Sequence, residues 1–301
     1  MTTIYQDYKE RRQYRQGKWE YLLNDEAKTA WIYCAPSLGR LKRYRIPDSV
    51  IIDGETYVIE KVDFGAFSKA KCLEHLVIPD SIGIIEECNF DFLPCLKSIY
   101  IGKGLENLSY WPFIMNKKLS TIIIDKDNPH LECDKGIVYS RGGLRAIKLF
   151  MKKKNLVIKE GVEEISHFFD STNTNIESIG FPSSLKKIGD NSFSECRKLK
   201  RVVLPEGFED CFCQCFTEDD ELEYVDLPST MTHLHVETFA LCPKLKTLII
   251  RTNSVLVPQG FGKKPFPLEI PADCTVYVPL PLVDEYRKHP LWADICTIQS
   301  I

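Results

Sequence analysis

Apolar side chains recur along this chain with a 23-residue period. Each repeat has an apolar anchor, followed by apolar residues three and five positions later. The spacing of three and then two predicts a short strand with one buried face in every repeat. A fixed period between 20 and 50 residues is typical of a solenoid, in which successive coils stack. The anchors that define this register are Leu73, Leu96, Leu119, Ile176, Leu199, Leu222 and Leu245.

Two further positions repeat with the anchors. A phenylalanine stands six residues before six of them, in two runs: Phe67, Phe90, Phe113 and Phe193, Phe216, Phe239. Stacked coils bury one another's apolar faces, so these rings predict a continuous aromatic spine. A small polar or sulfur side chain stands three residues before five anchors: Asn116, Asn173, Cys196, Asp219 and Cys242. We predict that these side chains form a ladder that satisfies backbone groups of the turns.

Each predicted strand is followed by signals for a turn and a second strand. Proline comes directly after it in four repeats, and proline ends a strand because it lacks an N–H group. A second apolar pair follows, nine and twelve residues after the anchor, as in Ile82 and Ile85 or Leu185 and Ile188. This pair predicts a second short segment on the opposite wall of each coil. Eleven extra residues separate the Leu119 repeat from the next one, around Lys153.

The repeat resembles the BspA-like (Treponema-type) leucine-rich repeat. The resemblance is carried by Phe193-x-x-Cys196-x-x-Leu199-x-x-Val202-x-Leu204-Pro205 and by the matching unit from Phe239 to Ile250. Residues 46–67 are similar to the first coil of that family, and residues 276–292 to its terminal cap. The resemblance covers about residues 40–300. It implies a mainly β repeat solenoid, a right-handed leucine-rich-repeat superhelix of 23-residue coils. Cys72 and Cys95 depart from this family pattern, because they stand one residue before their anchors instead of three.

We predict one continuous domain with four parts. Residues 1–18 form a polar leader with a short helix, and residues 19–45 an N-terminal cap with a β-hairpin that turns at 24–26. The solenoid covers residues 46–280, and residues 281–301 form a C-terminal helical cap. The extra residues predict an insertion at about 128–150. It is expected to project as a β-hairpin, with strands at 137–140 and 144–147 around Gly142-Gly143.

Charge and hydropathy exclude several partners. The net charge is −3, from 39 Lys and Arg against 42 Asp and Glu. Both signs are interspersed and form no basic stripe, which argues against a nucleic-acid partner. No apolar run approaches the roughly 18 residues of a transmembrane segment. The chain starts without an apolar signal region, which favours the cytoplasm. The resemblance favours the alternative, a cell-surface or secreted location, because many members of the family are exported.

Two clusters could carry chemistry. Cys211, Cys213 and Cys215 alternate, but metal sites usually use C-x-x-C spacing, and Cys211 falls on an inward position. His233 and His235 flank the inward Leu234, so both histidines are expected to point into solvent. The chain shows no nucleophile elbow and no phosphate-binding glycine loop. We therefore expect no catalytic residue, no metal and no cofactor. The alternative is a metal-binding or hydrolytic enzyme that uses the Cys211–Cys215 or the His233–His235 cluster.

The outward positions of the first strands offer a binding face. They lie two and four residues after each anchor, and the second of these columns is largely apolar, with Val77, Ile123, Val157, Val203 and Ile249. Such residues also suit any strand, so the column indicates either plain β-propensity or a stripe that meets a partner. Adjacent coils would place the most partner-like side chains together. The predicted partner-binding residues are Arg201, Tyr224, Asp226 and Arg251, with Tyr100 and His75 in a second cluster.

These observations predict a non-catalytic leucine-rich-repeat protein that binds an unidentified protein or glycan. The binding site is either this sheet face or the hairpin at 137–147. The resemblance implies adhesion at a bacterial surface, and a cytoplasmic scaffold is the alternative.

Overall fold

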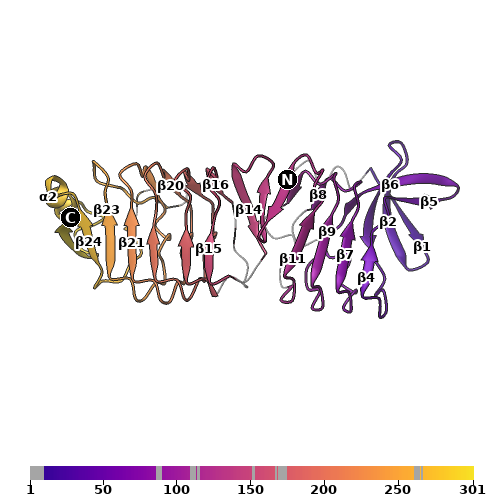
Figure 1. Ribbon diagram of the computed structural model, residues 1–301, viewed down its shortest axis with the longest axis horizontal. Helices are drawn as coiled ribbons and strands as arrows, with labels where there is room; N and C mark the ends of the chain where they lie inside the picture. Colours follow the sequence, from indigo (N-terminus) through magenta and orange to yellow (C-terminus); the bar gives the residue numbers. More distant parts are fainter. Residues whose placement is uncertain are drawn as a thin grey trace. The chain divides into compact units, whose positions relative to one another are not determined.

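The structure is a computed structural model that describes residues 10–85, 90–108, 113, 116–150, 153–166, 168, 175–260, 265 and 267–301. It divides into two compact units, Met1–Arg141 and Gly142–Ile301. Each unit consists of coils of short strands, as Figure 1 shows. The mainly β solenoid with 23-residue coils is therefore confirmed. No helix in the described ranges is long and apolar enough to cross a membrane.

The first unit begins with a five-stranded sheet in the order β1-β2-β3-β6-β5. Its strands are β1 (Arg12–Gln16), β2 (Trp19–Asn24), β3 (Thr29–Cys34), β5 (Ser49–Ile52) and β6 (Glu55–Val62). The predicted hairpin is present as the antiparallel pair β2–β3. The predicted helix of the leader is wrong where the chain is described, because residues 12–16 form β1 and pair with β2. The Arg12 guanidinium anchors this strand through its ion pair with Asp25, at 2.7 Å. Residues 1–9 lie outside the described residues.

The coils of the first unit present two walls. The first wall is the parallel sheet β11-β9-β7-β4, and the second contains the parallel pair β10–β8. Counterparts one repeat apart face each other: His75 is opposite Ser98, and Ser98 is opposite Thr121. The strand bounds are β4 (Arg43–Arg45), β7 (His75–Ile78), β8 (Ile84–Ile85), β9 (Ser98–Ile101), β10 (Asn107–Leu108) and β11 (Thr121–Ile124).

The second unit repeats the same plan. Its first wall contains the pair β15–β17 and the parallel sheet β19-β21-β23-β24-β25, while β14, β16, β18, β20 and β22 follow one another on the opposite wall. The first-wall strands are β15 (Asn155–Val157), β17 (Ser178–Gly180), β19 (Arg201–Val203), β21 (Tyr224–Leu227), β23 (Thr247–Ile250), β24 (Thr275–Val278) and β25 (Thr297–Ser300). The opposite wall has β14 (Arg145–Leu149), β16 (Glu164–Ile165), β18 (Lys187–Ile188), β20 (Asp210–Cys211) and β22 (His233–Leu234).

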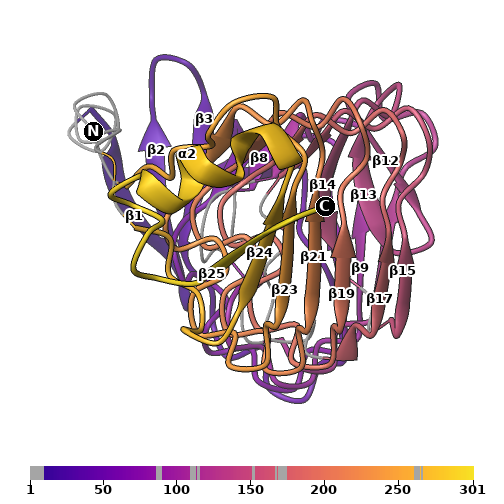
Figure 2. The ribbon, with the colours of Figure 1, turned by 90° about the vertical axis from the view of Figure 1, so that its left-hand side faces the viewer.

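The C-terminal cap is only partly helical. The short η3 (Leu280–Leu282) leads into α2 (Val283–Lys288), which lies across the end of the unit beside β24 and β25 in Figure 2. The helix covers only part of the predicted helical cap at 281–301, because His289 precedes Pro290 and adopts an extended backbone, with φ −75° and ψ 126°. A residue before proline disfavours the helical conformation. The chain then adds β25 in parallel to β24, a strand that the repeat pattern does not predict.

The aromatic spine is present within each unit. The Phe67–Phe90 and Phe90–Phe113 ring centroids are 5.6 and 5.8 Å apart. In the second unit the Phe193–Phe216 and Phe216–Phe239 distances are 5.5 and 5.9 Å, with nearly parallel rings. Offset-stacked rings at these distances attract one another beyond their apolar burial. The spine continues through Phe168, whose centroid is 5.9 Å from that of Phe193.

The predicted ladder satisfies backbone groups inside the coils. Asn116 Nδ2 donates to the carbonyls of Phe90 and Phe113, and its Oδ1 accepts from the Leu93 N–H. At the same repeat position, Asp219 Oδ1 accepts from the Cys196 N–H at 2.7 Å. Cys242 Sγ donates to the Phe216 carbonyl. Asn173, the fifth predicted member, lies outside the described residues.

The insertion contains the predicted strands but does not project. Its N-terminal arm is an antiparallel pair, β12 (Leu131–Asp134) with β13 (Ile137–Ser140), which turns at Lys135-Gly136. The second predicted strand is present as β14, which pairs in parallel with β16. Val138, Tyr139 and Leu149 are buried, so both strands contribute to packing. The sequence was misleading because both strands carry adjacent apolar residues, whose burial on two faces an outward hairpin does not provide.

We expect the cysteines to remain free thiols. All eleven described cysteines are free, and the coil that carries Asp219 separates Cys196 from Cys242. Two strand spacings amount to about 9–10 Å, which is too far for a disulfide. Alkylation under denaturing conditions followed by mass spectrometry should detect every cysteine as alkylated thiol. A Cys196–Cys242 linkage would contradict the stacking register.

Candidate functional site

The outward side of the first wall in the second unit collects four of the predicted binding residues. In the register of the sheet, Arg201 on β19 is opposite Tyr224 on β21, and Val203 is opposite Asp226. Arg251 follows directly after β23. The parallel pairing places Arg201 beside Tyr224, and Val203 beside Asp226, because the members of each pair are one repeat apart.

The four side chains form a connected group. The Arg201 guanidinium lies over the Tyr224 ring, with its central carbon 3.9 Å from the ring centroid. The Tyr224 hydroxyl donates to Asp226 Oδ2 at 3.1 Å. Arg251 donates to both carboxylate oxygens of Asp226, at 2.7 and 2.9 Å. Bidentate arginine–carboxylate pairs are strong and geometrically defined, so the group is held in one arrangement.

The electrostatics of the group follow from these contacts. Partial burial and the Asp226 carboxylate raise the pKa of Tyr224, which therefore stays a neutral donor at physiological pH. The hydrogen bonds from Arg251 to Asp226 raise the pKa of Arg251. Asp226 is only 9% exposed, and its charge is compensated by Arg251. Arg201 makes no hydrogen bond or ion pair with any residue in the described part of the chain, so its N–H donors face solvent.

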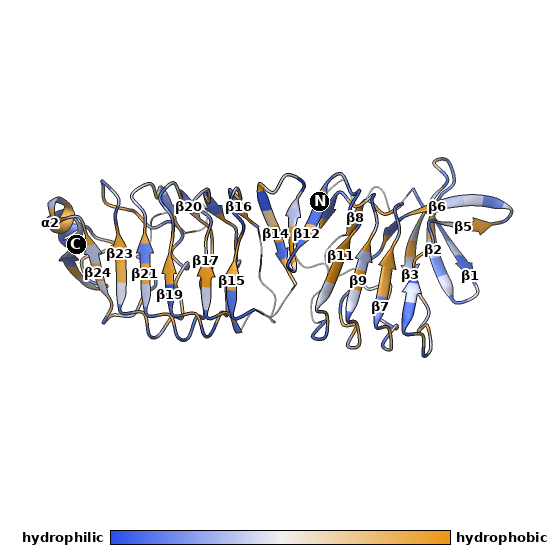
Figure 3. Ribbon diagram, in the orientation of Figure 1, coloured by the Kyte–Doolittle hydropathy of each residue, from blue (hydrophilic) through white to orange (hydrophobic). Residues whose placement is uncertain are grey.

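Apolar side chains are exposed on the same wall of the unit. Val157 on β15 and Val203 on β19 expose 69% and 45% of their surface. Gly180 is opposite Val157 on β17 and presents no side chain. Figure 3 shows apolar colour on β15, β17 and β19. We use the name sheet-face cluster for Arg201, Tyr224, Asp226 and Arg251 together with Val157 and Val203.

The second predicted cluster belongs to the first unit. The Tyr100 hydroxyl donates to Asp125 Oδ2 at 2.6 Å, a hydrogen bond that raises the pKa of Tyr100. His75 Nδ1 is 2.7 Å from Ser98 Oγ, its partner across β7 and β9. Tyr100 is opposite Val77 rather than His75. The six predicted residues therefore form two separate groups, one in each unit.

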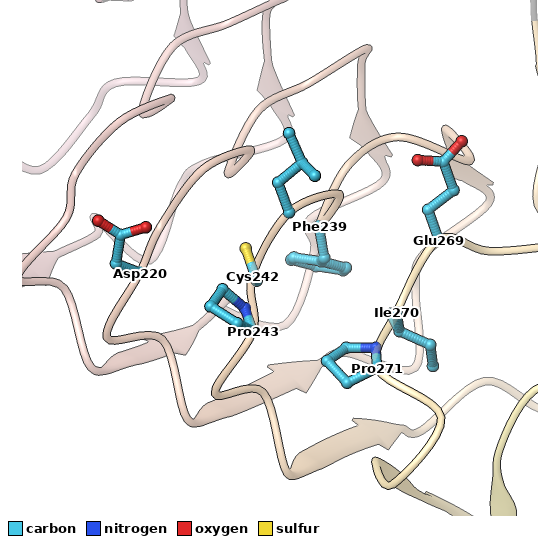
Figure 4. A pocket seen from close by; sticks show the side chains of 8 residues that line it. Asp220, Phe239, Cys242, Pro243, Glu269, Ile270 and Pro271 are labelled. Carbon is cyan, nitrogen blue, oxygen red and sulfur yellow. The ribbon is translucent and has the colours of Figure 1, made fainter.

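One surface hollow was not predicted. It has a volume of about 590 Å³ and lies in the second unit, at the turns near the C-terminal end of the spine. Figure 4 shows Asp220 and Glu269 on opposite sides of it, with Phe239 and Pro243 between them. The repeat pattern treats Phe239 and Cys242 as core, and the residues that shape the hollow, such as Pro271, lie beyond the last full repeat. The 23-residue period alone therefore does not predict this hollow.

The two candidate chemical clusters meet in the structure. Cys211 is buried, as predicted, and so is Cys215. The prediction for His235 is wrong, since this side chain is only 6% exposed. The alternation fails at the end of β22, where His235 forms an isolated bridge with Gln259 and the turn at 236–240 follows. Cys213, His235 and Glu237 come together, with their potential ligand atoms within 4.8 Å of one another.

Solved structures of leucine-rich repeat proteins are similar to this chain. A structure of a leucine-rich repeat protein from Eubacterium ventriosum aligns with a TM-score of 0.53 and 10% identity, over 88% of this chain and 83% of that one. A leucine-rich repeat protein from Bacteroides ovatus aligns with a TM-score of 0.48 and 16% identity, over 95% of this chain and 67% of that one. A leucine rich cell surface protein from Faecalibacterium prausnitzii aligns with a TM-score of 0.39 and 17% identity, over 78% of this chain and 93% of that one.

Comparison of the sequence with described protein families assigns the chain to one of them. No curated protein matches the chain. The family described as BspA type leucine rich repeat region matches residues 59–134 and 147–261, with six copies of the repeat. These residues make up more than half of the chain, and they include the spine, the described ladder residues and the strands from β7 to β12 and from β15 to β23. The chain therefore belongs to the BspA-type leucine-rich repeat family.

Proposed function

We propose that this protein is a non-catalytic binding module whose sheet-face cluster docks a protein partner. The observation that carries the proposal is the arrangement around Arg201. Its guanidinium is held against the Tyr224 ring, makes no ion pair in the described residues, and lies on a face with exposed valines. Tyrosine and arginine are enriched among the residues that dominate binding energies at protein interfaces.

The contacts of the cluster favour binding over catalysis. Asp226 accepts three hydrogen bonds, two from Arg251 and one from Tyr224, and is therefore poorly placed to act as a general base. Within the described ranges, no serine, cysteine or histidine side chain makes a hydrogen bond to these side chains. What the cluster does offer is a positioned cation, which requires no reorganisation when an anion arrives.

The cluster suits a protein better than a glycan. Sugars usually stack on an open aromatic face, and one face of the Tyr224 ring is covered by Arg201 at 3.9 Å. The guanidinium presents N–H donors that match a carboxylate. Val157 and Val203 present apolar surface on the same wall. The expected partner segment therefore carries Asp or Glu next to an apolar side chain.

Selection of random peptides from a display library on the purified protein tests this proposal. The enriched peptides should carry an acidic residue beside an apolar one. Their affinity should fall at least tenfold for the double variant Arg201→Ala with Tyr224→Ala, since the cation and its platform are lost. Arg201→Lys should also weaken binding, because a lysine lacks the planar fork.

The matched control is Arg197→Ala. Arg197 is also exposed, lies four residues away on the turn, and forms only surface ion pairs with Glu195, Glu218 and Asp220. Exposed pairs of this kind contribute little to stability. The circular dichroism spectrum and melting temperature should be nearly unchanged in all three variants. If the selected peptides bind the double variant as tightly as the wild type, the sheet face is not the site.

The insertion is the other candidate surface. Leu144 and Arg145 are exposed, whereas the strands around them are buried, so a deletion of residues 137–147 would damage the fold. Leu144→Ala with Arg145→Ala is the appropriate variant. A loss of peptide binding in that variant, with normal binding by the Arg201 and Tyr224 variant, would assign binding to the insertion.

Two biological settings fit the same face. In one, the module is an adhesin at a bacterial surface, and in the other it is a scaffold in the cytoplasm. Fractionation of the parent cell, followed by detection with an antibody, distinguishes them. Accessibility of the protein to protease in intact cells would support the adhesin.

A further inference from the structure

Three side chains with different metal-binding atoms converge where β20 and β22 end. They are a thiol, an imidazole and a carboxylate, supplied by Cys213, His235 and Glu237. We propose that these residues form a three-ligand zinc site that joins two successive coils. The site lies apart from the sheet-face cluster and does not depend on the function proposed for it.

The stacking register explains why the three residues meet. Cys211 on β20 is opposite Leu234 on β22, and the His235 N–H donates to the Cys211 carbonyl at 3.3 Å. Two residues further along, Cys213 stands level with position 236 of the next coil. The residues on either side of that position, His235 and Glu237, flank the thiol. Cys213 comes from one coil, and His235 and Glu237 come from the next.

The distances place the groups close enough to share one ion. Cys213 Sγ is 3.5 Å from Glu237 Oε2, and all potential ligand atoms lie within 4.8 Å of one another. Zinc binds cysteine sulfur at about 2.3 Å and histidine nitrogen at about 2.0–2.1 Å, in tetrahedral geometry. Ligand atoms around a tetrahedral ion therefore stand roughly 3–4 Å apart, which is close to the spacing of these three groups.

The chemistry of the three groups favours zinc over calcium or magnesium. A thiol and an imidazole are poor ligands for those hard cations, which bind oxygen. Zinc binds cysteine sulfur and histidine nitrogen readily and also accepts a carboxylate oxygen. Because a cysteine ligand must be deprotonated, zinc binding should release the proton of Cys213.

A supporting shell orients the ligands. Gln214 Nε2 donates to Glu237 Oε2 at 2.8 Å, and the Cys213 N–H donates to Asp190 Oδ1 at 2.9 Å. Groups of this kind fix ligand orientation in known metal sites. The Glu237 N–H donates to His235 Nδ1 at 3.2 Å, so zinc at that nitrogen would replace one hydrogen bond. Three protein ligands leave a fourth position for water or a group from a partner.

The neighbouring cysteines are not ligands in this arrangement. Cys215 Sγ lies within hydrogen-bond distance of the carbonyls of Ile188, Gly189 and Phe212 and is buried inside the coil. Cys211 is also completely buried. Cys213 and Glu237 are partly exposed, which gives an ion access from solvent.

Titration of the metal-free, reduced protein with Co²⁺ and Zn²⁺ tests the site. Co²⁺ bound to a thiolate gives a charge-transfer absorption band, which Zn²⁺ should then abolish. Isothermal titration calorimetry should give about one Zn²⁺ per chain. Cys213→Ser should remove the Co²⁺ band, and Glu237→Gln should weaken binding at least tenfold. Both side chains are partly exposed, so neither variant should unfold.

Matched controls identify the ligands. His233 belongs to the same His-Leu-His sequence but lies outside the cluster, so His233→Asn should bind like the wild type. Cys72→Ser removes an exposed thiol of the first unit and should likewise have no effect. A Co²⁺ band that persists in Cys213→Ser would overturn the proposal, as would the absence of the band in the wild type. Equal losses of affinity in His233→Asn and Glu237→Gln would also contradict the assignment.

Discussion

Phe193→Ala should lower the free energy of unfolding by about 3–5 kcal/mol. Phe193 is fully buried and packs against three rings, those of Phe168, Phe181 and Phe216, at centroid distances of 5.9, 5.7 and 5.5 Å. Alanine would leave a cavity between coils, and the flanking coils are fixed by their own strand pairs. The interior therefore has little freedom to collapse into the space.

Urea denaturation followed by circular dichroism measures this effect. Phe212→Ala is the matched control, because Phe212 is 39% exposed and lies on the adjacent coil outside the spine. It should cost less than about 1 kcal/mol, as substitutions at exposed positions usually do. A Phe193→Ala variant as stable as the control would mean that the rings do not support the stack.

Asp219→Asn should stabilise the protein at neutral pH by about 1–3 kcal/mol, the typical penalty of an unsatisfied buried polar group. Asp219 is completely buried, and its Oδ2 atom has no hydrogen-bond partner among the described residues. Burial raises the pKa of Asp219 well above its usual value. Another coil already carries asparagine at this repeat position, Asn116, which donates two hydrogen bonds to carbonyls.

The raised pKa of Asp219 determines how the stability gained by Asp219→Asn changes with pH. Because the pKa of Asp219 is higher in the folded than in the unfolded protein, the folded state binds the extra proton. The contribution of Asp219 to stability is complete below the unfolded pKa of about 3.9 and declines as the pH rises toward the folded pKa. Asparagine cannot titrate, so the advantage of Asp219→Asn should grow with pH.

Urea unfolding at several values between pH 4.5 and 8 tests the expectation. Asp220→Asn is the control, since Asp220 is half-exposed and pairs with Arg197 at the surface. It should show no comparable gain. A loss of stability in Asp219→Asn that is equal at all pH values would indicate that an ionised Asp219 supports the turn of Cys196.

The sequence predicted the fold through its periodic positions. Anchors, phenylalanines and the ladder each repeat with the coil, and all of them serve stacking between neighbours. The failures lie where residues leave that register. Phe168 precedes Phe193 by slightly more than one repeat, so the fixed spacing does not find it. β1 and β25 carry no repeat pattern, because their pairing is determined by the strands at each end of the solenoid.

The sequence also predicted which residues of the candidate site lie side by side, but not their hydrogen bonds. Residues one repeat apart face each other, which correctly placed Arg201 beside Tyr224 and Val203 beside Asp226. The hydrogen bonds of Asp226 depend on side-chain rotamers, which the repeat cannot specify. The cluster of Cys213, His235 and Glu237 was missed for another reason. His235 falls one position short of a full repeat from Cys213 and Glu237 one position beyond it, and each motif was considered within its own coil.

The parallel register of β19, β21 and β23 has a consequence for how such chains change in length. Removal of residues 201–223 would join Lys200 to Tyr224, which would then occupy the place of Arg201 in the shortened stack. Every remaining pair would keep its partner, since each coil contacts only its neighbours. Removal of a single residue would instead turn buried positions outward. We therefore expect relatives to gain and lose length in whole coils, by duplication or excision of complete units.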